Sequence, residues 1–104
     1  GGSAEVDGGG LVIAAGQGNT TGGNVEFAAG NGRYEGGDIT MSTGSSDLTN
    51  SGSFFVSTGS AGMEGESGGI FLATGNTTLG DAGNILLSTG DAADGIGGEI
   101  ALIV

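Results

Sequence analysis

Large apolar side chains recur at alternating positions in short segments of the chain, and each complete segment ends at a glycine. With that glycine taken as the anchor of a repeat, the fifth position before it holds Leu11, Val25, Ile39, Phe54, Ile70, Ile85 and Ile100. The third position before it holds Ile13, Phe27, Met41, Val56, Leu72, Leu87 and Leu102. Alternation with a period of two places both columns on one face of an extended segment. The pattern therefore predicts a series of short β-strands, each with one apolar face.

Glycines bound these segments and set the repeat. The anchors are Gly16, Gly30, Gly44, Gly59, Gly75 and Gly90, which follow one another at intervals of 14 to 16 residues. Seven positions before each anchor stands a second glycine, and these are Gly9, Gly23, Gly37, Gly52, Gly68 and Gly83, with Gly98 opening a last segment.

Repetition at a fixed short period is typical of solenoids, in which each repeat stacks on the one before it. The sequence therefore predicts an all-β fold, a parallel β-solenoid (β-helix) of about seven coils of 14–16 residues. Residues 1–104 would form a single repeat domain, which we expect to be a segment of a longer solenoid or filament. An antiparallel sandwich is the structural alternative.

The polar residue that follows each anchor predicts a bend, because glycine before Asn, Ser or Asp suits a left-handed or Asx-type turn. An apolar side chain usually returns four residues past the anchor, as Tyr34, Leu48, Met63 and Leu79 do. Ile96 takes this role in the last unit, and Val6 takes it in an incomplete leading unit. We expect this column to form an opposite wall that enters the core.

The other face of the segments carries Phe55, Phe71 and Leu86, which a stack of coils would make neighbours. Exposed contiguous apolar area usually marks an interface. These three residues are the predicted lateral interface; the alternative is that another part of the chain covers them.

The last residues of the sequence are apolar at Ile100, Leu102 and Val104. Open sheet ends pair readily with other strands unless polar repeats cap them. We therefore predict end-to-end stacking through these residues, with Gly1 of a following copy completing the repeat after Val104. The alternative is a cut through a longer array whose caps lie outside this sequence.

Thr43, Thr58, Thr74 and Thr89 form a file directly before four anchors. Paired threonine arrays occur in ice-binding solenoids, but the paired position here is apolar. We expect hydroxyl hydrogen bonds at the strand ends instead.

Composition excludes several classes of function. The chain has 27 glycines, no proline, cysteine or histidine, and a formal net charge of −11 with one basic residue, Arg33. Phosphate neutralisation needs clustered Lys and Arg, so we expect no nucleic acid partner. Anionic membrane surfaces are disfavoured for the same reason, and no apolar run is long enough for membrane insertion.

The chain lacks the residues that catalysis uses most often, because it has no His, the common base, and no Cys, the strongest nucleophile. We therefore expect no enzyme activity and no cofactor. Calcium is the alternative, with Asp7, Asp81, Asp91, Asp94 and the pair Glu64 and Glu66 in bends, although no acidic position repeats from unit to unit.

Two tripeptides, beginning at Asn19 and Asn76, match the acceptor motif for N-glycosylation, and both fall in predicted bends.

The phrases Met41-Ser42-Thr43-Gly44, Val56-Ser57-Thr58-Gly59, Leu72-Ala73-Thr74-Gly75 and Leu87-Ser88-Thr89-Gly90 recur through the chain. This style resembles the Ser-Thr-Gly repeats of large secreted β-solenoid proteins, including microbial adhesins and algal or protist surface-fibre proteins. The resemblance implies an extracellular or cell-surface location and a fibre or stalk, with no active-site residues.

The leading hypothesis is a structural, non-catalytic β-solenoid segment of an extracellular filament or cell-surface appendage. It would self-associate, or join neighbouring solenoid segments, by end-to-end strand stacking and lateral packing. The alternative is an adhesin-type or ice- or carbohydrate-binding solenoid module, with glycans as partners.

Overall fold

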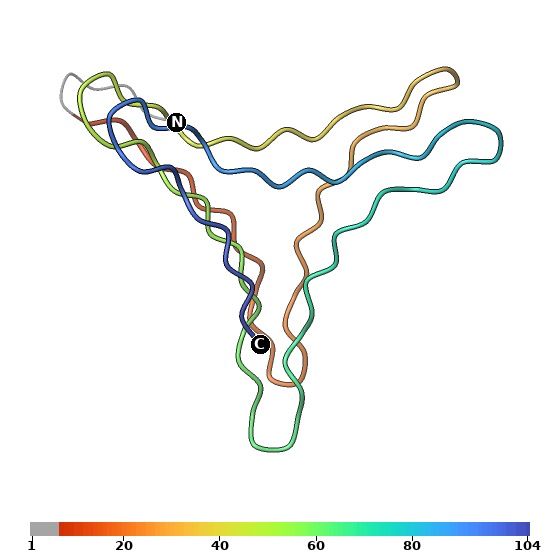
Figure 1. The fold of residues 1–104 in the computed structure, drawn as a ribbon. Helices are drawn as coiled ribbons and strands as arrows, with labels where there is room; N and C mark the ends of the chain where they lie inside the picture. Colours follow the sequence, from red (N-terminus) through yellow and green to blue (C-terminus); the bar gives the residue numbers. More distant parts are fainter. Residues whose placement is uncertain (1–6) are drawn as a thin grey trace. The chain divides into compact units, whose positions relative to one another are not determined.

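The computed structural model describes residues 7–104, which contain no helix and no strand. The chain runs in extended segments that reverse direction at bends over residues 19–21, 33–34, 47–49, 78–80 and 93–95 and at a turn over 63–64 (Figure 1). It divides into two units, Gly1–Phe54 and Phe55–Val104.

Each reversal lies inside a loop that begins at one anchor glycine and ends at the glycine opening the next segment. The loops span residues 16–23, 30–37, 44–52, 59–68, 75–83 and 90–98. We call the latter glycine the closing glycine of its loop. The positions of the reversals therefore follow the repeat that the sequence shows.

The prediction of a parallel β-solenoid of about seven coils is wrong for this structure. A solenoid needs main-chain hydrogen bonds between equivalent positions of successive repeats. The main-chain bonds of the described residues instead run from the closing glycine to the anchor of the same loop: Gly23 N–H to Gly16 O at 2.9 Å, Gly37 N–H to Gly30 O at 2.9 Å, and Gly52 N–H to Gly44 O at 3.0 Å. Main-chain pairing thus closes single loops and forms no ladder, and without strands the antiparallel sandwich is absent as well.

The closing glycines are needed for close approach. The residue before each anchor lies against the α-carbon of the closing glycine: a Cβ on Gly23 would be 3.3 Å from Ala15 Cβ, and one on Gly98 would be 3.2 Å from Thr89 Cβ. A Cβ on Gly52 would be equally close, at 3.3 Å from Thr43 Cβ, whereas one on Gly37, Gly68 or Gly83 would be at an ordinary van der Waals distance of 3.5–3.8 Å from the residue before its anchor. No residue within 7–104 has a positive φ, so the predicted left-handed bends are also wrong.

The position two residues after the anchor stabilises the loop tip in two ways. In the first two loops it is Gly18 or Gly32, where a Cβ would collide with the carbonyl oxygen of Thr21 or Glu35, so the tip closes tightly over a bare α-carbon.

In two later loops the same position carries a hydroxyl. Ser46 Oγ accepts from Thr49 N–H at 3.0 Å and from Leu48 N–H at 3.4 Å, and Thr77 Oγ1 accepts from Gly80 N–H at 3.3 Å. Hydroxyl groups that bond to nearby main chain in this way are typical of turns.

The predicted two faces differ in exposure, but neither is buried. Ile70 and Ile85 on the predicted inner face are 54% and 55% exposed, whereas Phe71 and Leu86 on the outer face are 92% and 85% exposed. No residue of the described chain is buried. The accessible surface is 10713 Å², against about 5,200 Å² for a compact monomer of this mass and about 14,000 Å² for an unfolded chain.

The predicted opposite wall does not form. Its members Tyr34, Leu48, Met63, Leu79 and Ile96 lie at or beside the loop tips and are almost fully exposed. Each loop carries its tip away from the segment that precedes it, so the side chain has no core to enter. Val6 lies outside the described residues.

We expect Gly52→Val to open loop 44–52, because its Cβ would be 3.3 Å from Thr43 Cβ where the loop base closes. The free energy of loop closure should become less favourable by about 1 kcal/mol, the net contribution of one intramolecular hydrogen bond. The measurement is the nuclear Overhauser contact between Thr43 and the α-protons of residue 52, together with amide exchange at that residue. Gly62→Ala is the control, since its Cβ would meet open space. An unchanged Thr43 contact in Gly52→Val would show that the closing glycine is not required.

Candidate interaction surface

Within residues 7–104 the structure holds no pocket, and no group of three or more His, Cys, Asp or Glu side chains is placed to hold a metal ion. The acidic residues considered for calcium therefore form no such group in the described chain. No helix there is long and apolar enough to cross a membrane. The features left to examine are the exposed apolar faces and the loops.

We define the inner stripe as the side chains five and three positions before each anchor, the two columns given above. Every complete segment that carries the stripe has the same length, seven positions from opening glycine to anchor, as in 23–30 and 68–75. The loops vary, with their glycines seven positions apart in 16–23 and nine apart in 59–68. Solvent-exposed loops tolerate such changes of length, whereas a segment that must match a partner does not. The stripe is therefore the part of the repeat whose geometry is constrained.

The predicted lateral interface residues Phe55, Phe71 and Leu86 lie on three successive segments of the second unit and are almost fully exposed. Their predicted adjacency depended on a stack of coils. Since the structure has no such stack, it leaves them as three separate exposed side chains. Their role in an interface stays a prediction.

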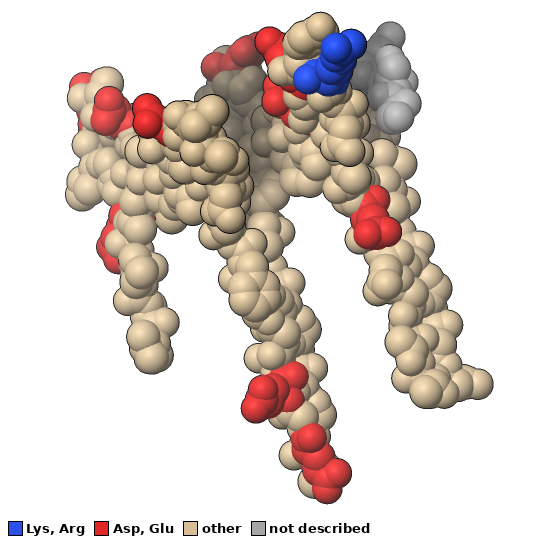
Figure 2. Space-filling view, turned by 90° about the vertical axis from the view of Figure 1, so that its right-hand side faces the viewer, with Lys and Arg blue, Asp and Glu red and all other residues tan. Residues whose placement is uncertain are grey.

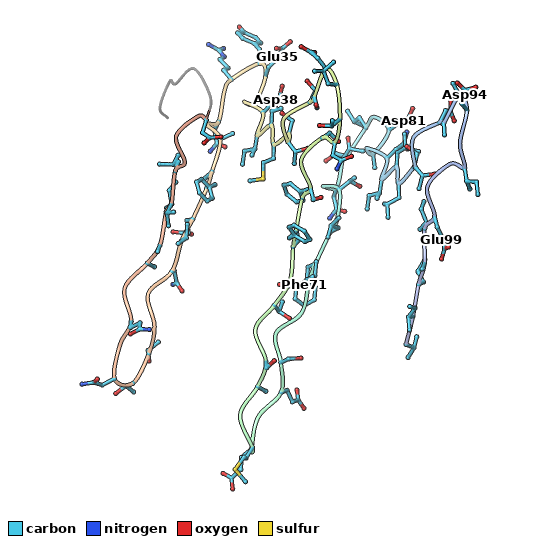
Figure 3. The ribbon with its side chains drawn as sticks, turned by 90° about the vertical axis from the view of Figure 1, so that its left-hand side faces the viewer. Glu35, Asp38, Phe71, Asp81, Asp94 and Glu99 are labelled. Carbon is cyan, nitrogen blue, oxygen red and sulfur yellow. The ribbon has the colours of Figure 1, made fainter. Side chains whose placement is uncertain are left out.

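Phe71 makes one local contact. Its ring lies over Gly69, where a Cβ would be 2.9 Å from the ring carbon Cζ (Figure 3). Any side chain at position 69 would displace this ring, so the glycine sets where the aromatic group stands beside its segment.

The predicted end-to-end residues are also accessible. Ile100 is half-exposed like most of the inner stripe, whereas Leu102, which also belongs to the stripe, and Val104 are almost fully exposed. The two sequon asparagines are exposed too; Asn19 begins the bend over 19–21, and Asn76 directly follows the anchor Gly75.

Most of the acidic side chains within residues 7–104 lie in the loops. Glu35, Asp47, Asp81 and Asp94 all belong to loops, and Figure 3 labels three of them near bends. On the face that Figure 2 shows, the acidic side chains stand in small groups separated by uncharged surface. The only base, Arg33, lies at a loop tip with its guanidinium carbon 5.5 Å from the centre of the Tyr34 ring, a cation–π distance.

The threonine file closes a loop. The Thr43 hydroxyl donates to the Gly52 carbonyl at 3.1 Å, across the base of its own loop, and Thr58, Thr74 and Thr89 lie against the closing glycines of theirs. The role of Ser46 and Thr77 at the loop tips was not predicted from the sequence. Its signal was available, because the position two after the anchor is Gly, Ser or Thr in four of the loops and Ala61 or Ala92 in the other two.

Comparison of the chain with protein-family models, with curated proteins and with solved structures gave no match. The resemblance to Ser-Thr-Gly repeat proteins therefore stays a prediction. The features that bear on function are the exposed stripe, the segments of constant length and the loops.

We expect the Gly69 α-protons to resonate upfield of their usual position, because the Phe71 ring lies over them. Phe71→Leu should abolish the shift by removing the ring current, whereas Phe55→Leu, on another segment, should preserve it. Proton NMR of the three chains is the measurement. If both variants left the Gly69 resonance unchanged, the placement of the ring would be wrong.

Proposed function

We propose that this chain is a structural, non-catalytic segment of an extracellular filament or cell-surface appendage, in which extended segments of neighbouring copies pack on one another. The observation that carries the proposal is the inner stripe: a regular apolar face on segments of constant length, which finds no partner within residues 7–104.

Apolar surface supplies the driving force. Complete burial of an Ile, Leu, Val or Phe side chain stabilises by about 1.5–3 kcal/mol, and roughly half of that remains for side chains as exposed as Ile70 and Ile85. Over the whole stripe the remaining gain is on the order of 10 kcal/mol. This gain opposes the loss of chain and side-chain freedom on association, so binding of this kind is cooperative with ordering.

Free main-chain N–H and C=O groups determine how a second chain aligns with a segment. Within the described chain the main-chain hydrogen bonds stand only at the bases of loops 16–23, 30–37 and 44–52, so the extended segments keep their N–H and C=O groups available. An extended edge with free main chain and alternating apolar side chains is a template for a second chain.

The constant segment length keeps the register. Because side chains alternate with a period of two, and because the stripe stands at fixed distances from both glycines of every complete segment, its two positions lie on one face of each segment. A partner can therefore meet the same face on every segment. The loops, which vary in length and carry most of the acids, stay in solvent and keep separate chains apart through their charge.

An extracellular setting is supported by the repeat style alone, through its resemblance to secreted fibre proteins. The alternative of an ice-binding module has less support, because the Thr43 hydroxyl donates a hydrogen bond to the Gly52 carbonyl oxygen within its own loop.

We expect Ile70→Asp to abolish association, because an unpaired carboxylate would replace an apolar side chain where the stripe becomes buried. Such burial costs several kcal/mol, so the association constant should fall by at least about a hundredfold. Sedimentation velocity and electron microscopy of the purified chain are the measurements, with circular dichroism of the monomer expected to stay unchanged.

Met63→Asp is the matched control, since it places the same charge on an exposed apolar position at a loop tip. It should leave association within a few-fold of the wild type. Equal effects of the two substitutions would mean that net charge, and not the stripe, governs association.

We expect association to strengthen as salt is raised from about 10 mM to about 150 mM, because the Debye length falls from about 30 Å to about 8 Å and screens the repulsion between chains of net charge −11. The double variant Asp91→Asn and Asp94→Asn should associate at lower salt. Light scattering at a series of NaCl concentrations is the measurement. Association that weakened with salt would point to ion pairs as the main attraction and contradict the apolar stripe.

A further inference from the structure

Loop 16–23 differs from the other loops in the chemistry of its tip. Each of the others carries at least one carboxylate, and each has a large apolar side chain at or beside its reversal. Loop 16–23 has neither; its reversal consists of Asn19, Thr20 and Thr21. The reversal that lacks the usual side chains is therefore formed entirely by an Asn-x-Thr sequon, whereas the other sequon begins beside its anchor, outside the reversal over 78–80.

The geometry presents this sequon at the outer end of the loop. The α-carbon of Gly18 lies against the carbonyl oxygen of Thr21, so Asn19 and Thr20 are the central residues of a tight turn. The bond from Gly23 N–H to Gly16 O closes the loop base at 2.9 Å. Asn19 is exposed, and none of the side-chain hydrogen bonds within residues 7–104 involves its amide.

We propose that Asn19 is the acceptor of an N-linked oligosaccharide. This proposal rests on the extracellular location in the proposed function. The side-chain nitrogen Nδ2 forms a bond to the anomeric carbon of the sugar, the bond from that carbon to a lipid-linked pyrophosphate breaks, and the amide loses one proton. The donor is a lipid-pyrophosphate oligosaccharide, and Thr21 supplies the hydroxyl that the motif requires.

The second sequon has the same tripeptide in a different place. Asn76 stands directly after the anchor Gly75, beside the end of segment 68–75. A glycan at Asn76 would crowd the segment that we propose to pack against neighbouring copies. A glycan at Asn19 projects from a loop tip and is compatible with that packing.

The test uses the full chain, residues 1–104, with Asn76→Gln in every sample so that any glycan reports on Asn19. The chain is translated behind a cleavable secretory signal with microsomes, and entry into the lumen is verified by protection from added protease. We expect the protected chain to gain one glycan that a peptide N-glycosidase removes. Asn19→Gln and Thr21→Ala should each abolish the gain, whereas the matched control Thr20→Ala, which keeps the motif, should retain it.

A protected chain that remains unmodified would overturn the proposal, as would a glycan that survives Asn19→Gln. This readout does not depend on association. A chain that is glycosylated at Asn19 and stays monomeric would overturn the proposed function alone, and a chain that associates but stays unmodified after verified entry into the lumen would overturn the Asn19 site alone.

Discussion

At the base of each loop, the residue before the anchor packs on the bare α-carbon of the closing glycine. The contact recurs from Ala15 on Gly23 to Thr89 on Gly98, and a Cβ at either glycine would be 3.2–3.3 Å from its neighbour. Reversal of the chain, the spacing of the segments and the exposure of the loop tips all follow from this contact. At Gly23, Gly52 and Gly98 a side chain would be crowded, so close approach accounts for glycine there better than conformational freedom does, since no described glycine has a positive φ.

The contact joins residues that are close together in the sequence, and the local nature of the structure follows from this. Closing a loop of eight to ten residues costs little chain entropy, so each loop forms without help from distant residues. The same locality means that the closures gather no core: Ile70 and Ile85 remain half-exposed although they lie on the face best shielded by their own segments. Like isolated two-stranded hairpins, single closed loops of this kind are marginal in water until more surface is buried.

A chain that has regular apolar faces and no core is suited to association, in which the missing contacts come from other copies. Two features fit that role: the inner stripe is repeated on segments of one length, and the acids are concentrated in the loops between them. In the assembly that we propose, repulsion among the loops would limit how soon separate chains meet, and the stripe would determine how they pack. The sequon at Asn19 belongs to this division, because it lies on a loop tip and away from the stripe.

The sequence by itself determined the positions of the repeats, the glycines that bound them and the two faces of each segment. These are local properties, set by a period of two and by the need for glycine at the loop bases. They agree with the places where the chain bends and with the greater exposure of Phe71 and Leu86 over Ile70 and Ile85. The apolar side chains available for an interaction surface could therefore be predicted.

The tertiary structure decided what each segment pairs with. Equivalent positions on stacked coils and glycines across one loop produce the same spacing of residues, so periodicity could not distinguish a solenoid from a series of closed loops. The tertiary structure also decided that Tyr34, Leu48 and Met63 lie at exposed tips, and that the Thr43 hydroxyl bonds to Gly52 in its own loop. Pairing between segments is a non-local property, and an alternating apolar pattern specifies that a face should be covered without specifying what covers it.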